Sequence, residues 1–312
     1  MLFRSVCLSR RALIAAAEAH AGALPWEPHD RWLLAMPLAH VGGASVVLRS
    51  VHAQRAVVLG PERFDADALL ERAREHEATL LSVVPTMLEK LLPRRPPASV
   101  RAVLLGGAAC PSELLARGRA LGWPLLPTYG LSECCAQVCT QRLGDPRPSG
   151  VGPPLPGVEL RVVEGGIEVR GPTRMDGFWG ERPLDPGAWL RTGDAGRIDE
   201  RGHLHVLGRL DDRIVTGGEN VDPTAVEDAL SSHPNVAAAC VVGVADPSWG
   251  QRVTALIVPR GEPPTLESLR AHLEPRLARF AHPRALRLVD ALPLTRAGKL
   301  DRRAARALVH DE

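Results

Sequence analysis

The chain has 312 residues, of which 45% are hydrophobic and 24% are charged, and its formal net charge is +2. This composition is typical of a soluble globular protein of two domains, without the basic excess that captures nucleic acid or an anionic membrane. No apolar run approaches the roughly 18 residues of a membrane span. The six cysteines lack paired zinc-ligand spacing, so we expect reduced thiols in a cytoplasmic protein.

The amino-terminal stretch allows two interpretations. Three arginines with serines, and no acidic residue before Glu18, resemble a transit peptide. The alternative is a helix that starts near Ser9 and carries Leu13, Ile14 and Ala17 on one face. We favour the helix because nothing marks a cleavage site.

The first half of the chain alternates apolar runs with stretches of helical spacing. Strand character is found at residues 32–36, 44–50, 56–59, 79–84 and 100–105. Helical spacing is found at residues 64–76, 86–92 and 111–121. A glycine-rich loop that carries His40 should follow the first strand. Such alternation predicts a parallel, layered α/β body.

The sequence pattern changes in the second half of the chain. After about residue 142, proline and glycine punctuate short strand-like runs at 158–163, 166–169 and 189–207, which predict a small antiparallel unit. A last segment in the order β, α, β, β, α, β predicts a compact unit of roughly 100 residues. We therefore expect a main domain at 1–208, a hinge at 209–212 and a second domain at 213–312.

Six short motifs follow one another along the chain. Residues 128–133 (TYGLSE) offer a flat ring, a glycine turn, a hydroxyl and a carboxylate, a set that suits a nucleotide. Alone this stretch is weak evidence, because Tyr-Gly turns are common in loops. The other motifs are LLGGA at 104–108, RTGD at 191–194, GRLD at 208–211, GGEN at 217–220 and GK at 298–299.

In this order and spacing the chain resembles the adenylate-forming superfamily of acyl-CoA synthetases. Residues 36–40, 80–88 and 128–137 look most like its branch of o-succinylbenzoate-CoA ligases, which are aryl-CoA ligases. The resemblance implies the carboxy-terminal part of the adenylate-forming large domain, with parallel α/β layers and a small antiparallel β unit. A compact, mobile α+β domain would follow.

The resemblance also implies an activity. Such enzymes are ATP-dependent acid-CoA ligases, which join a carboxylate to AMP with release of pyrophosphate and then let the thiol of coenzyme A displace AMP. The first step brings a carboxylate to a polyanion, so it needs preorganised positive charge and Mg²⁺. An aryl acid such as o-succinylbenzoate, used in menaquinone biosynthesis, or a relative of benzoate is the expected substrate. An acyl carrier protein is the alternative acceptor.

Five residues match positions that handle the nucleotide in the family. Tyr129 would stack on adenine, and Gly106 and Gly107 would form the other wall. Ser132, where the family usually has threonine, would reach the α-phosphate. Glu133 would hold Mg²⁺, although an acid at a helix N-terminus is its ordinary role.

Three further residues match positions around the ribose and phosphates. Asp194 would accept the two ribose hydroxyls, Arg209 would contact ribose or phosphate, and Lys299 would bridge the attacking carboxylate and the α-phosphate. The ordinary alternatives are a turn aspartate, a surface arginine and a solvated loop lysine. Only the match to the family's motifs favours the functional roles of these three residues over the ordinary ones.

The resemblance also implies roles in thioester formation for residues of the hinge and the second domain. Asp211 matches the family's pivot, and Gly217 and Gly218 would line the channel for pantetheine, where only backbone leaves room. Trp249 and Phe280 match positions that hold the nucleotide of coenzyme A, with core packing as the alternative for Phe280.

The acyl pocket should contain His40, Val84, Thr128 and Gly130, with Arg49 as a carboxylate partner. We count His40 among the catalytic residues as well. A loop histidine held by a hydrogen bond is the equal alternative.

One expected motif is missing. The family's phosphate loop, with its own lysine, should lie just before or at Arg4, where this sequence begins. The chain is then either a piece of a full ligase or a short form that has lost adenylation and moves an acyl group between coenzyme A and a carrier protein. A third possibility is a non-catalytic binding partner.

Overall fold

The computed structural model describes residues 5–295 and 300–310. It divides into two compact units. Unit 1 comprises Met1–Cys110 and Leu114–Val206, and unit 2 comprises Pro111–Glu113 and Leu207–Glu312. The predicted catalytic residue Lys299 and the expected phosphate-loop position at Arg4 lie outside the described residues. The hinge at 209–212 stays a prediction.

Unit 1 contains a six-stranded sheet in the order β3-β2-β4-β5-β6-β7. Strands β2 to β6 pair in parallel, and only β7 runs antiparallel, against β6. The predicted parallel α/β body is thereby confirmed. The strands are β2 (Arg31–Leu34), β3 (Ala56–Leu59), β4 (Leu80–Val83), β5 (Ala102–Leu105), β6 (Leu125–Tyr129) and β7 (Cys139–Thr140).

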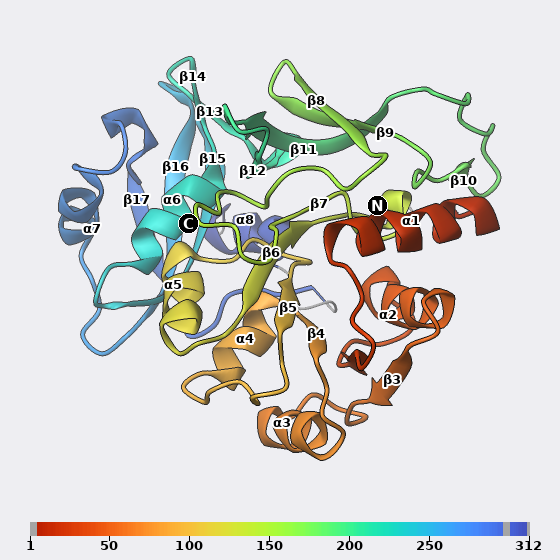
Figure 1. The fold of residues 1–312 in the computed structure, drawn as a ribbon. Coiled ribbons are helices and arrows are strands. Elements are labelled where there is room, and N and C mark those ends of the chain that lie inside the picture. Colours follow the sequence, from red (N-terminus) through yellow and green to blue (C-terminus); the bar gives the residue numbers. More distant parts are fainter. Residues whose placement is uncertain (1–4, 296–299, 311–312) are drawn as a thin grey trace. The chain divides into compact units, whose positions relative to one another are not determined.

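Helices cover both faces of this sheet (Figure 1). Leu33 and Leu81 pack with α3 and α4, whereas their neighbours Trp32 and Leu80 pack with α2 and the end of α1. Successive side chains alternate between faces, so burial on both faces produces continuous apolar runs in the sequence. The helices are α1 (Arg10–Ala23), α2 (Val41–His52), α3 (Ala66–Glu75), α4 (Pro85–Leu91) and α5 (Ser112–Ala120).

Helix α2 corrects one expectation. Residues 44–50 are helical, not a strand, and the glycines after His40 belong to the helix rather than to a loop. Val46, Arg49 and Ser50 lie three and four residues apart and are buried together. Valines suggested a strand, but packing of this stripe outweighs their weak helix propensity.

Helix α1 is confirmed, with one error in its buried face. Ser9 is its N-cap, and Ser9 Oγ accepts a hydrogen bond from the backbone of Ala12 at 3.3 Å. The buried stripe consists of alanines and His20, whereas Ile14 is 37% exposed. Alanines let α1 approach its neighbours closely, so the largest apolar side chain is not the most buried one.

A four-stranded sheet in the order β12-β11-β9-β8 follows in the chain. Strands β8 and β9, and β9 and β11, pair antiparallel, which confirms the predicted antiparallel unit. The strands are β8 (Glu159–Val163), β9 (Gly166–Arg170), β11 (Leu190–Ile198) and β12 (Leu204–Arg209). A separate two-stranded ribbon pairs β1 (Val6–Cys7) with β10 (Gly177–Phe178).

Unit 2 has its own five-stranded sheet. Its strands pair antiparallel except β17, which lies parallel to β16. The predicted order β, α, β, β, α, β is confirmed, while the short strand β14 and helix α8 were not expected. The strands are β13 (Ile214–Thr216), β14 (Glu219–Val221), β15 (Val236–Asp246), β16 (Gly250–Pro259) and β17 (Ala285–Leu288).

Helices also cover both faces of the unit 2 sheet. Val241 and Val253 pack with α6 and α7, whereas Cys240 and Leu256 pack with α8. Helix α7 ends before Pro275, which cannot continue it. The helices are α6 (Pro223–Ser231), α7 (Leu266–Leu273) and α8 (Arg302–His310).

All six cysteines are free thiols. In the part of the chain that the structure describes, no helix is both long and apolar enough to cross a bilayer. The same residues contain no cluster of three or more His, Cys, Asp or Glu side chains suited to a metal ion.

Candidate functional site

The carboxyl ends of three neighbouring parallel strands carry predicted site residues. Val84 follows β4, Gly106 and Gly107 follow β5, and Thr128 lies at the end of β6. A Cβ on Gly106 would lie 2.7 Å from Thr128 Cγ2, and one on Gly107 would lie 3.1 Å from Val84 Cγ1. Ligands of parallel α/β sheets bind beyond this edge. The structure therefore brings Gly106 and Gly107, predicted for the adenine wall, close to Thr128 and Val84, predicted for the acyl pocket.

A bulge in β11 presents Asp194. The pairing of β11 with β9 shifts register between Arg191 and Ala195, and Gly193 within the shift has a φ of +75°. Glycine adopts this φ readily because it has no Cβ, and a bulge turns side chains out of the regular ladder. Thr192 Oγ1 accepts a hydrogen bond from the Asp194 backbone at 3.1 Å, which fixes the turn.

Tyr129, at the end of β6, meets this carboxylate. Tyr129 Oη donates a hydrogen bond to Asp194 Oδ2 at 2.6 Å. Burial of the ring, and secondly the charge of Asp194, raise the pKa of the Tyr129 hydroxyl, so it stays protonated as a donor. The residues predicted to contact adenine and ribose are thus direct neighbours.

Ser132 and Glu133 lie on a short 3-10 helix, η1 (Ser132–Cys134), which Leu131 separates from Gly130. Ser132 is exposed and Glu133 is half-buried. Among the described residues, none donates a hydrogen bond to the Glu133 carboxylate, while its backbone carbonyl accepts one from Met175 at 2.7 Å. Mg²⁺ in nucleotide sites is held by one or two carboxylates together with phosphate oxygens. A single available carboxylate fits that ion.

Arg49 is a buried cation on the inner face of α2, with 3% of its surface exposed. Its guanidinium carbon lies 5.8 Å from the centroid of the Trp32 ring, and burial lowers its pKa to about 10. Within residues 5–295 and 300–310, its Nε and Nη2 atoms have no hydrogen-bond partner. A buried charge without a counter-ion is costly, so this position suits an incoming anion.

His20 and Gln137 form a hydrogen-bonded link to the strand ends, and the sequence analysis assigned a role to neither. His20 Nδ1 donates to Gln137 Oε1 at 2.9 Å, and Gln137 Nε2 donates to Thr128 Oγ1 at 3.0 Å. The His20 ring centroid lies 5.0 Å from that of Trp32. The sequence signal that could have identified His20 is a single histidine among the alanines on the buried face of α1.

The remaining acyl-pocket residues have different surroundings. His40 is the exposed N-cap of α2, without a hydrogen bond from its side chain to the helix. Gly130 is half-buried, and a Cβ there would lie 1.4 Å from the carbonyl oxygen of Ala136. Only glycine permits this backbone approach.

The residues predicted for the thiol half lie in unit 2. Gly217 has a φ of +59°, and a Cβ on it would lie 2.7 Å from Trp249 Cε3. The Arg284 guanidinium carbon stands 3.8 Å above the centroid of the same indole. Gly218 is exposed in the same turn, and Phe280 is 37% exposed. Trp249 is therefore held flat beside the glycine turn.

Two more predicted residues lie where unit 2 begins. Arg209 is the last residue of β12 and is exposed. Asp211 is the exposed central residue of the short 3-10 helix η2 (Leu210–Asp212).

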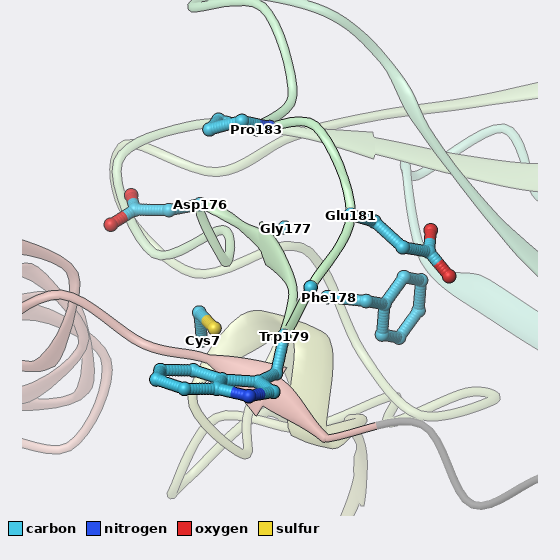
Figure 2. A pocket seen from close by; sticks show the side chains of 8 residues that line it. Cys7, Asp176, Gly177, Phe178, Trp179, Glu181 and Pro183 are labelled. Carbon is cyan, nitrogen blue, oxygen red and sulfur yellow. The ribbon is translucent and has the colours of Figure 1, made fainter.

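A cavity of about 130 Å³ lies elsewhere, beside β1 and β10 (Figure 2). Cys7 and Phe178 line it together with Trp179, whose side chain is 80% exposed. None of the predicted site residues contributes to its wall. We therefore locate the candidate site at the strand ends of unit 1 and not in this cavity.

Comparison with protein families decides the assignment. Residues 4–179 match the family described as AMP-binding enzyme. The chain belongs to this family. Residues 225–299 match its companion, the AMP-binding enzyme C-terminal domain. Both the recognised resemblance and the expected fold class are thereby confirmed.

Curated relatives of this AMP-binding enzyme are ligases. The 2-succinylbenzoate–CoA ligase of Bacillus licheniformis is 37% identical in an alignment of length 299 that covers 88% of this chain and 61% of that protein. The ligase of the same name from Bacillus pumilus is 36% identical in an alignment of length 296 that covers 88% of this chain and 60% of the relative. The chain thus spans about three fifths of the length of these relatives.

Solved structures agree with this assignment. The o-succinylbenzoate CoA synthetase (MenE) of Bacillus subtilis, in complex with the acyl-adenylate intermediate OSB-AMP, matches with a TM-score of 0.89 and 34% identity. The match covers 96% of this chain and 66% of that one. The same enzyme with ATP and magnesium ion gives a TM-score of 0.86 at 34% identity, with coverage of 95% and 65%. The amide bond synthetase McbA of Marinactinospora thermotolerans gives 0.88 at 34%, with 97% and 67%.

These relatives do not support the alternative activities. The curated proteins above are named for ligation of an acid to CoA, not for acyl transfer or for a binding function. None of them is named for a reaction with an acyl carrier protein.

Proposed function

We propose that this chain acts in an ATP-dependent acid-CoA ligase that converts an aryl acid to its acyl-adenylate and then to its CoA thioester. The family assignment and the names of the relatives support this activity. The observation that carries the proposal is the hydrogen bond between Tyr129 and Asp194 at the carboxyl edge of the sheet. It joins a ring suited to a base and a carboxylate suited to two ribose hydroxyls.

The nucleotide then occupies one half of the site. Adenine lies between Tyr129 and the Gly106-Gly107 turn, where missing side chains leave the backbone accessible to a flat ring. Asp194 accepts the ribose hydroxyls, and Ser132 donates to the α-phosphate. Holding the nucleotide at several points converts a collision between two anions into a reaction within one complex.

The acid occupies the other half, towards Val84, Thr128 and Arg49. An aryl acid with a second carboxylate, such as o-succinylbenzoate, supplies acceptors for the two Arg49 nitrogens that have no hydrogen-bond partner among the described residues. The carboxylate to be activated remains near the phosphates. An acid is then selected by the distance between its second carboxylate, which pairs with Arg49, and the carboxylate that reacts.

Charge neutralisation controls the adenylation step. Glu133 would hold Mg²⁺, which supplies Lewis-acid stabilisation to the phosphate oxygens. Lys299 neutralises the attacking carboxylate and the α-phosphate as they approach. Thioester formation then depends on residues of unit 2, with Gly217 beside the thiol arm and Trp249 beside the nucleotide of coenzyme A. The hinge at 209–212 is the proposed pivot between the two half-reactions.

Calorimetric titration with AMP tests the nucleotide half by itself. Asp194→Asn retains the shape of the side chain but removes its charge, so we expect AMP affinity to fall about tenfold, which corresponds to loss of one charge-assisted hydrogen bond. Asp199→Asn is the control for loss of a carboxylate charge, because Asp199 lies five positions further along and directly follows the same strand, β11. Equal AMP affinity in Asp194→Asn and the native chain would contradict the assignment.

A further inference from the structure

A run of hydrogen bonds in unit 1, which we call the His20 relay, has only one possible direction. It ends at the backbone carbonyl of Cys139, which can only accept, so Thr128 Oγ1 donates to it at 2.7 Å. The one hydrogen of this hydroxyl is then used, and Thr128 Oγ1 accepts at its other contact, from Gln137 Nε2 at 3.0 Å. The amide of Gln137 therefore presents its oxygen, Oε1, to His20 Nδ1, 2.9 Å away.

The tautomer of His20 follows from this direction. An amide oxygen cannot donate, so Nδ1 of His20 carries the hydrogen of this contact. The imidazole is neutral, because burial, and secondly the charge of Arg49, lower its pKa well below 6.5. The charges of Arg101 and Arg142 lower the pKa of His20 as well. A neutral imidazole has one ring hydrogen, so Nε2 carries a lone pair, and this atom bonds to no described residue.

The surroundings of the relay hold its side chains in place. His20 is fully buried on α1, and its ring centroid lies 5.0 Å from that of Trp32. Gln137 is 4% exposed. It follows Cys135 and Ala136, whose φ values of +53° and +90° are unusual for residues with a side chain. Backbone strain of this kind is concentrated where a structure fixes a functional group.

The relay also determines which side of Thr128 faces the candidate site. Its hydroxyl is used by Cys139 and Gln137, and its methyl carbon, Cγ2, lies against Gly106, 2.7 Å from where a Cβ on that glycine would be. Turning χ1 of Thr128 to another staggered position would break both hydrogen bonds and move the methyl group away from Gly106. The predicted adenine wall is thus supported by a side chain that the relay locks in one rotamer.

We propose that His20 and Gln137 are positioning residues, which lock the rotamer of Thr128 and thereby the Gly106 side of the nucleotide pocket. His20 acts through two other side chains and contacts neither nucleotide nor acid. The effect on nucleotide binding rests on the proposed function, whereas the tautomer of His20 does not. A histidine buried only for packing would not have its tautomer set by the hydroxyl of Thr128, because ring hydrogens follow the hydrogen bonds that the ring makes.

Nitrogen-15 NMR of the imidazole rings tests the relay in the native chain. We expect the His20 ring to carry its hydrogen on Nδ1 at neutral pH, with the signal assigned by its loss in His20→Asn. Thr128→Val keeps the shape of the side chain but removes the hydroxyl, so the direction of the relay is no longer fixed. A fraction of His20 with the hydrogen on Nε2 should then appear.

Thr140→Val is the matched control for Thr128→Val. Thr140 is paired with Thr128 across β6 and β7 and is 1% exposed, but its Oγ1 bonds to no described residue. We expect it to leave the tautomer of His20 as in the native chain.

Calorimetric titration with AMP tests the positioning role. His20→Leu removes the donor to Gln137, so we expect AMP affinity to fall about fivefold, which corresponds to one lost hydrogen bond. His20→Asn keeps a donor close to the position of Nδ1, and its AMP affinity should stay within about twofold of the native value.

Four results would contradict parts of this account. Hydrogen on Nε2 in the native chain, or a tautomer that Thr128→Val leaves unchanged, would overturn the relay. Native AMP affinity in His20→Leu, or an equal fall in His20→Leu and His20→Asn, would overturn the positioning role. A native chain that binds no AMP would instead count against the proposed function, and the NMR measurement would still decide the direction of the relay.

Discussion

Tyr129 donates its hydroxyl proton to the Asp194 carboxylate across 2.6 Å, although the two residues are 65 positions apart in the chain. The first residue ends a strand of the parallel sheet, and the second is presented by a bulge in the antiparallel sheet. This contact joins two of the motifs that the sequence analysis singled out. It also makes the hydroxyl of Tyr129 difficult to ionise.

Spectrophotometric titration checks this contact directly, because Tyr129 is the only tyrosine in the chain. Burial and the Asp194 charge raise its pKa above the ordinary value of 10.0, so we expect no phenolate in the folded protein as pH rises through 10. Asp194→Asn should lower the pKa by removing the negative charge. A phenolate that forms in the folded native chain with a midpoint near pH 10 would contradict the contact.

Replacement of Arg49 by methionine separates stability from selectivity. Methionine removes a buried charge that has no hydrogen-bond partner for two of its nitrogens among the described residues. We expect the free energy of unfolding to rise by about 1–2 kcal/mol in urea titrations. Steady-state kinetics should show a KM for an acid with a second carboxylate that is about tenfold higher, and a smaller change for benzoate.

Two results would contradict the role of Arg49. One is a marked loss of stability in Arg49→Met, which would indicate a structural partner. The other is an equal change in KM for both acids. Arg49→Lys is the matched variant, because it keeps a positive charge at the same position.

The buried His20 predicts a pH dependence of stability. Burial, and secondly the charge of Arg49, lower its pKa well below 6.5 in the folded protein. The unfolded chain therefore binds one more proton at this residue below pH 6.5, so the free energy of unfolding falls as pH drops from 6.5 towards the folded pKa. Above pH 6.5 this contribution is fully present.

His20→Gln should remove that contribution and keep a hydrogen-bonding group near Gln137. We expect the slope of unfolding free energy against pH, measured between pH 6 and 5 in urea, to decrease by up to about 1.4 kcal/mol per pH unit. An unchanged slope would show that another group is responsible.

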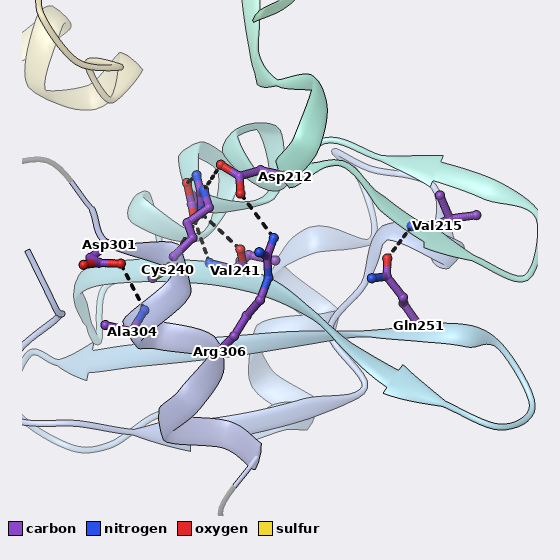
Figure 3. A network of polar contacts seen from close by, with 10 residues as sticks. Asp212, Val215, Cys240, Val241, Gln251, Asp301, Ala304 and Arg306 are labelled. Atoms are coloured by element: carbon purple, nitrogen blue, oxygen red, sulfur yellow. Dashed lines mark hydrogen bonds and ion pairs between the residues drawn. The ribbon is translucent and has the colours of Figure 1, made fainter. Parts of the chain in front are cut away.

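Much of the fold was predictable because local signals agreed with packing. Strand β5 is a continuous apolar run and β4 is interrupted only by Ser82, as sheets buried on both faces require, and proline or glycine follows each run. Helix α2 was not predictable in this way, since its valines favour a strand and only packing makes it helical. Helix α8 begins with charged residues whose partners lie in distant segments (Figure 3), so its own sequence pattern did not predict a helix there.

In the candidate site, too, some features could be predicted from the sequence and others depend on the packed structure. Motif spacing located Tyr129 and Asp194 separately, but their hydrogen bond depends on a bulge that spacing does not reveal. Arg49 was noted as a carboxylate partner, yet its burial, with two nitrogens that have no hydrogen-bond partner among the described residues, is a property of the packed structure. The link from His20 through Gln137 to Thr128 joins three segments and was missed entirely.

Exchange of labelled pyrophosphate into ATP tests the proposed ligase activity most directly. The assay uses the 312-residue chain with Mg²⁺ and a panel of aryl acids that includes o-succinylbenzoate. We expect exchange that depends on the acid, is strongest with o-succinylbenzoate, and is suppressed in Lys299→Ala while thioester formation from supplied acyl-AMP persists. Lys90→Ala is the control, because Lys90 is the only other lysine. A folded chain without acid-dependent exchange, or equal loss of both half-reactions in Lys299→Ala, would contradict the account.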